Sequence, residues 1–235
     1  MCARGDMDAL YLKERSPRAC LDIVCATVAQ KLSLYVVLAI ATLALQMGLG
    51  HPVAELIFSP SWPGNPWYEE VLIGLGLGVS LVAVSRAASQ RLGWTKRIDM
   101  EFRTILGPLS STSIFWLALM SSLVEELFFR GFLQPRVGLE AAALIFGLAH
   151  FPYRRALIPW TIAAIAVGWL FGWFFENRGC LIVPVLAHFV VNYFNLHYIL
   201  RPKADEPVPR SPWISWRRLT PVASRPETDR SEVQP

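Results

Sequence analysis

The stretch VEELFFRGF, residues 124–132, decides how this sequence is interpreted. The residues before it, 104–124, carry no charge and are long enough to cross a bilayer as a helix, which takes about 20 apolar residues. Glu125, Glu126 and Arg130 then follow within the same apolar segment. An ionisable side chain at membrane depth costs at least ~3 kcal/mol on insertion scales, so such residues face a partner or a cavity and mark function. The stretch therefore predicts a membrane helix that carries a functional polar cluster.

The composition places the whole chain in the membrane class. Of its 235 residues, 54% are hydrophobic and 17% are charged, whereas soluble domains carry roughly 25% charged residues. The apolar residues come in long blocks, which favours membrane helices over a soluble core. The net charge of +4 is clustered at the ends of these blocks, so we interpret it as a topology signal and expect no nucleic-acid partner.

Six apolar segments predict an all-α fold, a polytopic transmembrane bundle of about six membrane helices. The fourth segment holds only roughly 20 Å of helix and is expected to be short or partly inserted. We divide the chain into an N-terminal cytoplasmic segment (1–31), the bundle (32–200) and a disordered tail rich in Pro and Arg (201–235). The apolar segments are 32–49, 71–85, 105–133, 141–153, 156–175 and 179–200.

Lys and Arg are distributed unevenly between these segments. They gather before the first segment, after the second, after the fourth and in the tail, while the loop 51–70 contains none. Because positively charged loops stay on the cytoplasmic side, the pattern predicts an integral, multi-pass membrane protein with both termini in the cytoplasm. The same pattern leaves open the membrane face toward which the polar cluster opens.

Three polar clusters interrupt the apolar pattern, at residues 125–130, at His150, and at His188 with Asn192. Counted at 1.5 Å per residue from the same membrane face, Glu126 lies about 12 Å deep, His150 about 16 Å and His188 about 13 Å. The three values converge on one layer of the membrane. We therefore expect the three clusters to meet inside the bundle.

Within the first cluster, helical spacing separates the two carboxylates. Glu126 and Arg130 are four residues apart, so they share a face and form an ion pair that keeps Glu126 charged. Glu125 lies about 100° further around the helix and is expected near a histidine. A buried carboxylate in that position is suited to act as a general base on a water molecule.

The other two clusters supply complementary groups. His188 and Asn192 are four apart and aim at one point, where they donate hydrogen bonds to a developing oxyanion. Phe146 precedes His150 by four and lies along the same side, and His150 orients the water or shares its proton. Water, base and oxyanion donors together describe the hydrolysis of an amide bond. The alternative is a structural set of polar residues that locks the helices together.

Three motifs stand in order along the chain: EELFFR (125–130), FGLAH (146–150) and HFVVN (188–192). They match the patterns EExxxR, FxxxH and HxxxN. The chain thereby resembles the CPBP family of intramembrane proteases, which includes CAAX prenyl proteases of type 2, bacteriocin-processing proteins and Abi-like proteins. The resemblance covers about residues 113–196 and implies an intramembrane endopeptidase with its protease core at about 104–200.

The resemblance also implies a role for each motif residue. The residues that activate the water would be Glu125 and His150. The residues that stabilise the oxyanion would be His188 and Asn192. The residues that shape the site would be Glu126, Arg130 and Phe146.

We expect a glutamic rather than a metallo type of mechanism, with no cofactor. If zinc is bound after all, its ligands would be Glu125, His150 and His188. Against zinc, the sequence contains no HExxH motif, and the neighbouring Arg130 is a poor companion for a cation.

Two other functions stay open. The chain could be a non-catalytic membrane immunity or scaffold protein of the same family, although no motif residue is missing. A proton-coupled carrier is less favoured, because carriers usually show internal repeats and this sequence has none. The expected partners are the lipid bilayer and a membrane-anchored protein or peptide substrate. The sequence leaves open the identity of that substrate and whether it is prenylated.

Overall fold

The computed structural model describes residues 17–60, 62–106, 109–151 and 154–200, so the predicted disordered tail lies outside the described residues. Within these ranges the secondary structure is helical, apart from an isolated bridge between Phe58 and Cys180. The long helices are α2 (Pro17–Gly48), α3 (Trp67–Arg91), α4 (Thr95–Leu106), α5 (Ser111–Glu126), α7 (Leu139–Ala149), α8 (Ile158–Arg178) and α9 (Ile182–Leu200). The short ones are η1 (Val53–Leu56), η2 (Leu127–Leu133), α6 (Gln134–Val137) and η3 (Arg155–Leu157).

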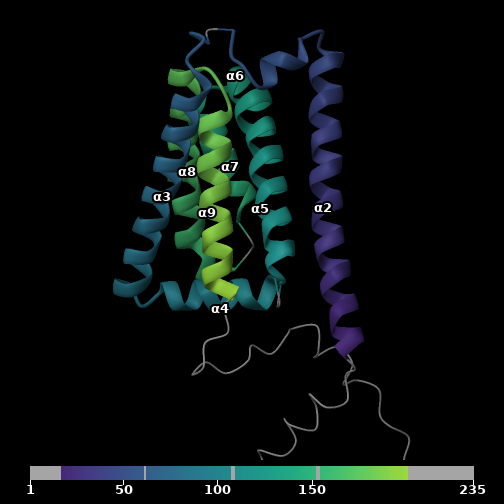
Figure 1. Ribbon diagram of the computed structural model, residues 1–235, viewed down its shortest axis with the longest axis vertical. Coiled ribbons are helices and arrows are strands. Elements are labelled where there is room, and N and C mark those ends of the chain that lie inside the picture. Colours follow the sequence, from purple (N-terminus) through teal and green to yellow (C-terminus); the bar gives the residue numbers. More distant parts are fainter. Residues whose placement is uncertain (1–16, 61, 107–108, 152–153, 201–235) are drawn as a thin grey trace, which may run out of the picture.

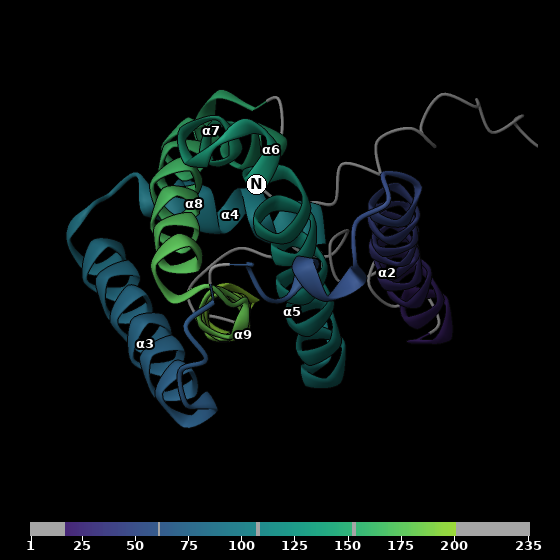
Figure 2. The same ribbon diagram turned by 90° about the horizontal axis from the view of Figure 1, so that it is seen from above.

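The helices form a bundle in which α9 lies between α3 and α5 (Figures 1 and 2). α7 and α8 pack against each other as an antiparallel pair, and α2 stands on the outer side of α5. α4 lies across one end of the bundle (Figure 1). α2 begins and α9 ends at this same end.

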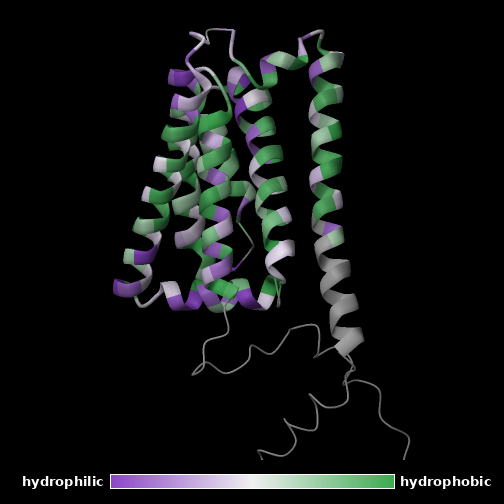
Figure 3. Ribbon diagram, in the orientation of Figure 1, coloured by the Kyte–Doolittle hydropathy of each residue, from purple (hydrophilic) through white to green (hydrophobic). Residues whose placement is uncertain are grey.

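The predicted all-α membrane bundle is confirmed. Four helical stretches are long and apolar enough to cross a membrane, and two shorter apolar helices accompany them in the described part of the chain. The shorter ones are Leu32–Gly48, within α2, and α7, which is the helix predicted to be short. Many large apolar side chains on the outer faces are exposed, as suits lipid contact, and the hydrophobic colouring dominates the middle of the helices (Figure 3).

The sequence reading misplaced the start of the third segment, expected at residue 105. Ile105 and Leu106 belong to α4, and α5 begins only at Ser111, where the Ser110 side chain accepts a hydrogen bond from the backbone N–H of Ser113 at 3.1 Å. α4 itself was not predicted. It alternates charged with apolar residues, so a search for uncharged segments passes over it.

The first two segments are also longer than expected. α2 begins at Pro17, ahead of the apolar segment 32–49, and α3 runs from Trp67 to Arg91 instead of covering only 71–85. In α3, Gly74 and Gly78 face α9 so closely that a Cβ at Gly78 would lie 2.7 Å from the Cβ of Val190. Small residues at such positions let two membrane helices approach closely.

The end of the bundle opposite α4 is fastened by a buried carboxylate. Glu70 at the start of α3 is fully buried and accepts hydrogen bonds from Arg178 at the end of α8, the shortest at 2.7 Å. Gly179 follows with a φ of 71°, a conformation that suits glycine, and a Cβ there would lie 2.7 Å from the Cα of Trp62. The contact ties the start of α3 to the end of α8.

Candidate active site

The helix that carries the two glutamates changes its winding directly after them. α5 ends at Glu126, and the π-helical η2 follows, in which hydrogen bonds run between residues five apart. Such turns are rare and often occur at functional sites. Gly131 lies inside this turn, where the Cβ of any other residue would overlap the backbone carbonyl of Leu56. The chain segment η1 therefore packs directly against the wide turn and supports it.

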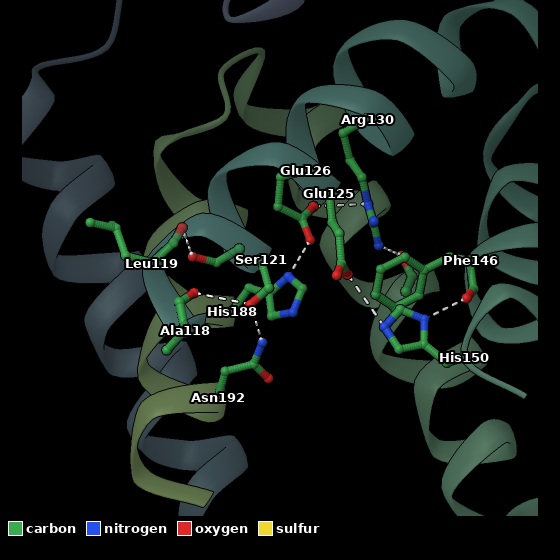
Figure 4. A network of polar contacts seen from close by, with 12 residues as sticks. Ala118, Leu119, Ser121, Glu125, Glu126, Arg130, Phe146, His150, His188 and Asn192 are labelled. Carbon is green, nitrogen blue, oxygen red and sulfur yellow. Dashed lines mark hydrogen bonds and ion pairs between the residues drawn. The ribbon is translucent and has the colours of Figure 1, made fainter. Parts of the chain in front are cut away.

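Glu126 and Arg130 form a buried ion pair at this turn (Figure 4). Nε of Arg130 lies 3.1 Å from Oε2 of Glu126, and both side chains are almost wholly buried. Nη2 of Arg130 donates to the carbonyl of Gly168 on α8 at 2.9 Å. Nδ1 of His188, on α9, lies 2.7 Å from Oε1 of Glu126. The pairing expected from helical spacing is confirmed, and it joins three helices.

Arg130 also contacts the second motif, through the ring of Phe146. Its Cζ lies 4.4 Å from the ring centroid of Phe146, close enough for a cation–π contact. The ring of His150 lies 4.4 Å from that of Phe146, and Trp160 packs edge-on against His150 at 5.3 Å. Nδ1 of His150 contacts the carbonyl oxygen of Phe146 at 2.7 Å. Because a carbonyl oxygen only accepts, Nδ1 carries the hydrogen and Nε2 is left for another partner.

His150 does not lie inside a helix, as the segment 141–153 predicted. α7 ends at Ala149, and His150 is the residue that caps it, with φ −89° and ψ 4°. The sequence contains a reason, since Phe151 precedes Pro152 and a residue before proline disfavours the helical conformation. The early end of the helix leaves the imidazole next to the first motif.

Glu125 lies between His150 and a residue from outside the motifs. Its Oε2 is 3.3 Å from Nε2 of His150, a distance at which the pair attracts when the histidine is charged. Its Oε1 accepts a hydrogen bond from the hydroxyl of Tyr35 on α2 at 3.0 Å. Oε2 is buried and accepts no hydrogen bond of good geometry from the described residues. Sequence analysis did not identify Tyr35, although a hydroxyl within an apolar segment is a signal of the same kind as the motif residues.

His188 and Asn192 share a face of α9, and each contacts a different partner on α5. His188 contacts Glu126, while Nδ2 of Asn192 donates to Oγ of Ser121 at 3.0 Å (Figure 4). Ser121 in turn donates to the carbonyl of Ala118 at 3.1 Å, so the serine is held in place. These contacts engage one nitrogen of His188 and one amide hydrogen of Asn192, so the expected convergence of their remaining donors stays a prediction. Ser121 was also missed, although it stands one helical turn before Glu125.

The residues proposed as zinc ligands are not arranged as a metal site. Among the residues that the structure describes, no three His, Cys, Asp or Glu side chains are grouped so that they could hold a metal ion. Glu125 pairs with His150, whereas His188 turns Nδ1 to Glu126. The guanidinium of Arg130 already supplies a positive charge beside these carboxylates. The side chains as placed therefore do not fit zinc.

Residues 108–194 match the family model of type II CAAX prenyl endopeptidases, Rce1-like. This segment contains all three motifs and every motif residue described above. The match covers less than half of the chain. α2, α3 and α4 precede the matched residues, so Tyr35 reaches the site from outside the segment that matches the family model.

A relative of the chain is found in Bacillus subtilis (strain 168), the uncharacterised protein YpbD. The two are 35% identical over 113 residues, which is 45% of this chain and 58% of YpbD. The chain thus spans little more than half the length of the curated relative that it matches. No solved structure matches the chain.

Proposed function

We propose that this chain is an intramembrane endopeptidase, which hydrolyses a peptide bond of a membrane-anchored protein or peptide. The observation that carries the proposal is the buried carboxylate of Glu125, which lies 3.3 Å from His150 inside a bundle of membrane-spanning helices. The match of residues 108–194 to the family model of type II CAAX prenyl endopeptidases supports the same reaction class. A buried carboxylate beside an imidazole is an arrangement that removes a proton from water.

In the proposed reaction, Glu125 is the general base. Its Oε2 takes a proton from a water molecule bound beside His150, and the water oxygen attacks the carbonyl carbon of the scissile peptide bond. The proton then passes to the amine that leaves, so the site returns to its starting state. His150 holds the water through Nε2, because Nδ1 is engaged by the carbonyl of Phe146.

His188 and Asn192 are proposed to stabilise the negative oxygen that forms on the substrate. Asn192 has a second amide hydrogen besides the one donated to Ser121. Arg130 holds Glu126 as a carboxylate, so Nδ1 of His188 donates a hydrogen bond to it. To donate to the oxyanion through Nε2 at the same time, His188 must carry a proton on both ring nitrogens. Donors fixed in this way are typically worth about 10²–10³ in rate.

The remaining motif residues are proposed to shape the site. Arg130 balances the charge of Glu126, and Phe146 stacks between Arg130 and His150, so a single network holds the base and the oxyanion donors in register. We propose a metal-free mechanism, because the guanidinium of Arg130 already supplies positive charge beside the carboxylates and would repel a metal cation. We also propose that both termini lie in the cytoplasm.

The test is cleavage by the purified chain in lipid vesicles. Two fluorescence-quenched peptides serve as probes, one anchored by a farnesylated cysteine near its C-terminus and one anchored by an apolar transmembrane segment. We expect cleavage of at least one peptide by the wild type, no cleavage by Glu125→Gln, and no loss of rate when a zinc chelator is added. If neither peptide is cut, or if Glu125→Gln cuts as well as the wild type, the proposal is wrong. Loss of activity with the chelator, restored by zinc, would overturn the metal-free part alone.

A further inference from the structure

α2 stands outside the residues that match the family model, yet one of its polar side chains reaches the site. Tyr35, Thr42 and Gln46 follow one another at helical spacing, and Thr42 and Gln46 are buried. Apolar residues such as Val37 and Ile40 occupy the exposed face. Polar groups in an apolar segment require partners. Thr42 donates to the carbonyl of Leu38 in its own helix at 2.8 Å, whereas Tyr35 and Gln46 find partners outside α2.

Two of these side chains bind residues on the helix that carries the first motif. Oε1 of Gln46 accepts a hydrogen bond from Nη2 of Arg136 at 2.9 Å, beyond the end of η2. The hydroxyl of Tyr35 donates to Oε1 of Glu125 at 3.0 Å. Gln46 is three helical turns from Tyr35, so α2 is fastened at two levels along the same helix. Tyr35 is therefore held at the carboxylate by a second, separate contact.

The two carboxylate oxygens of Glu125 have different neighbours. Oε1 is occupied by the hydroxyl, while Oε2 is the oxygen next to His150. The last torsion of a glutamate side chain is soft, so a carboxylate without an anchor rotates over a broad range. A hydroxyl on one oxygen removes that freedom and points the other oxygen into the site.

We propose that Tyr35 is a positioning residue that orients Glu125 for proton transfer from water. The inference rests on the proposed function, since it assigns Tyr35 a part in the same reaction. Tyr35 does not touch the substrate in this account, so its loss affects the chemical step and not substrate binding. The chain thus completes its site with a group supplied by a helix outside the segment that matches the family model.

The experiment uses the vesicle assay with the peptide that the wild type cleaves. We expect Tyr35→Phe to lower kcat about tenfold, the size of one hydrogen bond to a charged group, and to leave KM unchanged. Tyr68→Phe is the matched control, because Tyr68 is exposed at the start of α3 and lies away from the motifs. Leu38→Ala tests whether looser packing of α2 alone has the same effect, and we expect it to change kcat less than twofold.

Restoring a hydrogen-bond donor at position 35 tests the inference most sharply. p-Aminophenylalanine at position 35 keeps a hydrogen-bond donor where the hydroxyl stood, and we expect it to restore most of kcat. An unchanged kcat for Tyr35→Phe, an effect confined to KM, an equal loss in Leu38→Ala, or no rescue by the amine would overturn the inference. These outcomes leave the proposed function intact, because the wild type still cleaves and Glu125→Gln does not. If the wild type fails to cleave, the function and this inference fall together.

Discussion

Glu125 and Glu126 are adjacent in sequence, yet their carboxylates contact histidines from different helices. Oε2 of Glu125 lies 3.3 Å from His150 after α7, and Oε1 of Glu126 lies 2.7 Å from His188 on α9. Glu126 is also paired with Arg130, whereas Oε2 of Glu125 accepts no hydrogen bond of good geometry from the described residues. One carboxylate is thus fixed as part of the framework, and its neighbour is available for chemistry.

The ion pair between Glu126 and Arg130 predicts a large effect when one partner is removed. Arg130→Met leaves Glu126 as an uncompensated buried charge, and we expect the free energy of unfolding to fall by about 3–5 kcal/mol. The double variant Glu126→Gln with Arg130→Met removes both charges, so it should be more stable than Arg130→Met alone. Unfolding in mixed detergent micelles measures both. A double variant no more stable than the single one would contradict the pairing.

Gly131 predicts a steric effect at the π-helical turn. Gly131→Ala forces the new Cβ into the carbonyl of Leu56, so we expect a loss of about 1–3 kcal/mol in the free energy of unfolding, typical of overpacking. Gly76→Ala is the control, because a Cβ at Gly76 on α3 meets nothing within 4 Å. There we expect no loss, and a gain of roughly 0.5–1 kcal/mol from higher helix propensity. Equal effects of the two substitutions would show that η1 does not support the turn.

The contact between Glu70 and Arg178 predicts how the far end of the bundle opens. Cys180 is buried next to it, and burial raises the pKa of its thiol, so in the folded protein it should react slowly with a maleimide. In a background where Cys2, Cys20 and Cys25 are replaced by serine, we expect Arg178→Met to speed labelling at least about tenfold.

The neighbouring glutamate supplies the control for that measurement. Glu69 lies 3.3 Å from Arg178 but its side chain is half exposed, so Glu69→Gln should leave the labelling rate of Cys180 within about twofold, as surface pairs contribute little. Rapid labelling of Cys180 without any substitution would mean that this end is not closed.

Asn192 predicts a loss of rate without a loss of fold. If its amide stabilises the oxyanion, Asn192→Ala should lower kcat by about 10²–10³, while the thermal midpoint changes little because the side chain is only partly buried. Asn177→Ala, at an exposed position near the end of α8, is the matched control and should keep full activity. Comparison of kcat with KM in the vesicle assay separates the two effects. A rise in KM alone would assign Asn192 to substrate binding.

Much of the framework could be predicted from the residues themselves. Apolar block lengths gave the membrane helices and the short α7, and spacing along a helix gave the pairing of Glu126 with Arg130. The three motifs were expected at one depth, and residues from all three meet in one network (Figure 4). These features depend on local periodicity and on bilayer thickness, which a single sequence carries.

What the sequence did not reveal depends on how helices pack. The contact of Tyr35 with Glu125 joins residues 90 positions apart, and no local pattern states which face of α2 meets α5. Nor does a local pattern reveal that the hydroxyl of Ser121 accepts a hydrogen bond from the amide of Asn192. α4 was missed because its charges hide it from a search for uncharged segments.

The central claim is that Glu125 activates a water molecule that attacks the substrate directly. The most direct measurement is mass spectrometry of the peptide and the enzyme after a single turnover in ¹⁸O-labelled water, for the wild type and for Glu125→Gln. The account predicts one ¹⁸O atom in the new terminal carboxylate with the wild type, no covalent adduct on the enzyme at any time, and a rate at least about 10²-fold lower for Glu125→Gln at an unchanged thermal midpoint. A peptide bound covalently to the enzyme, or cleavage by Glu125→Gln at close to the wild-type rate, would contradict it.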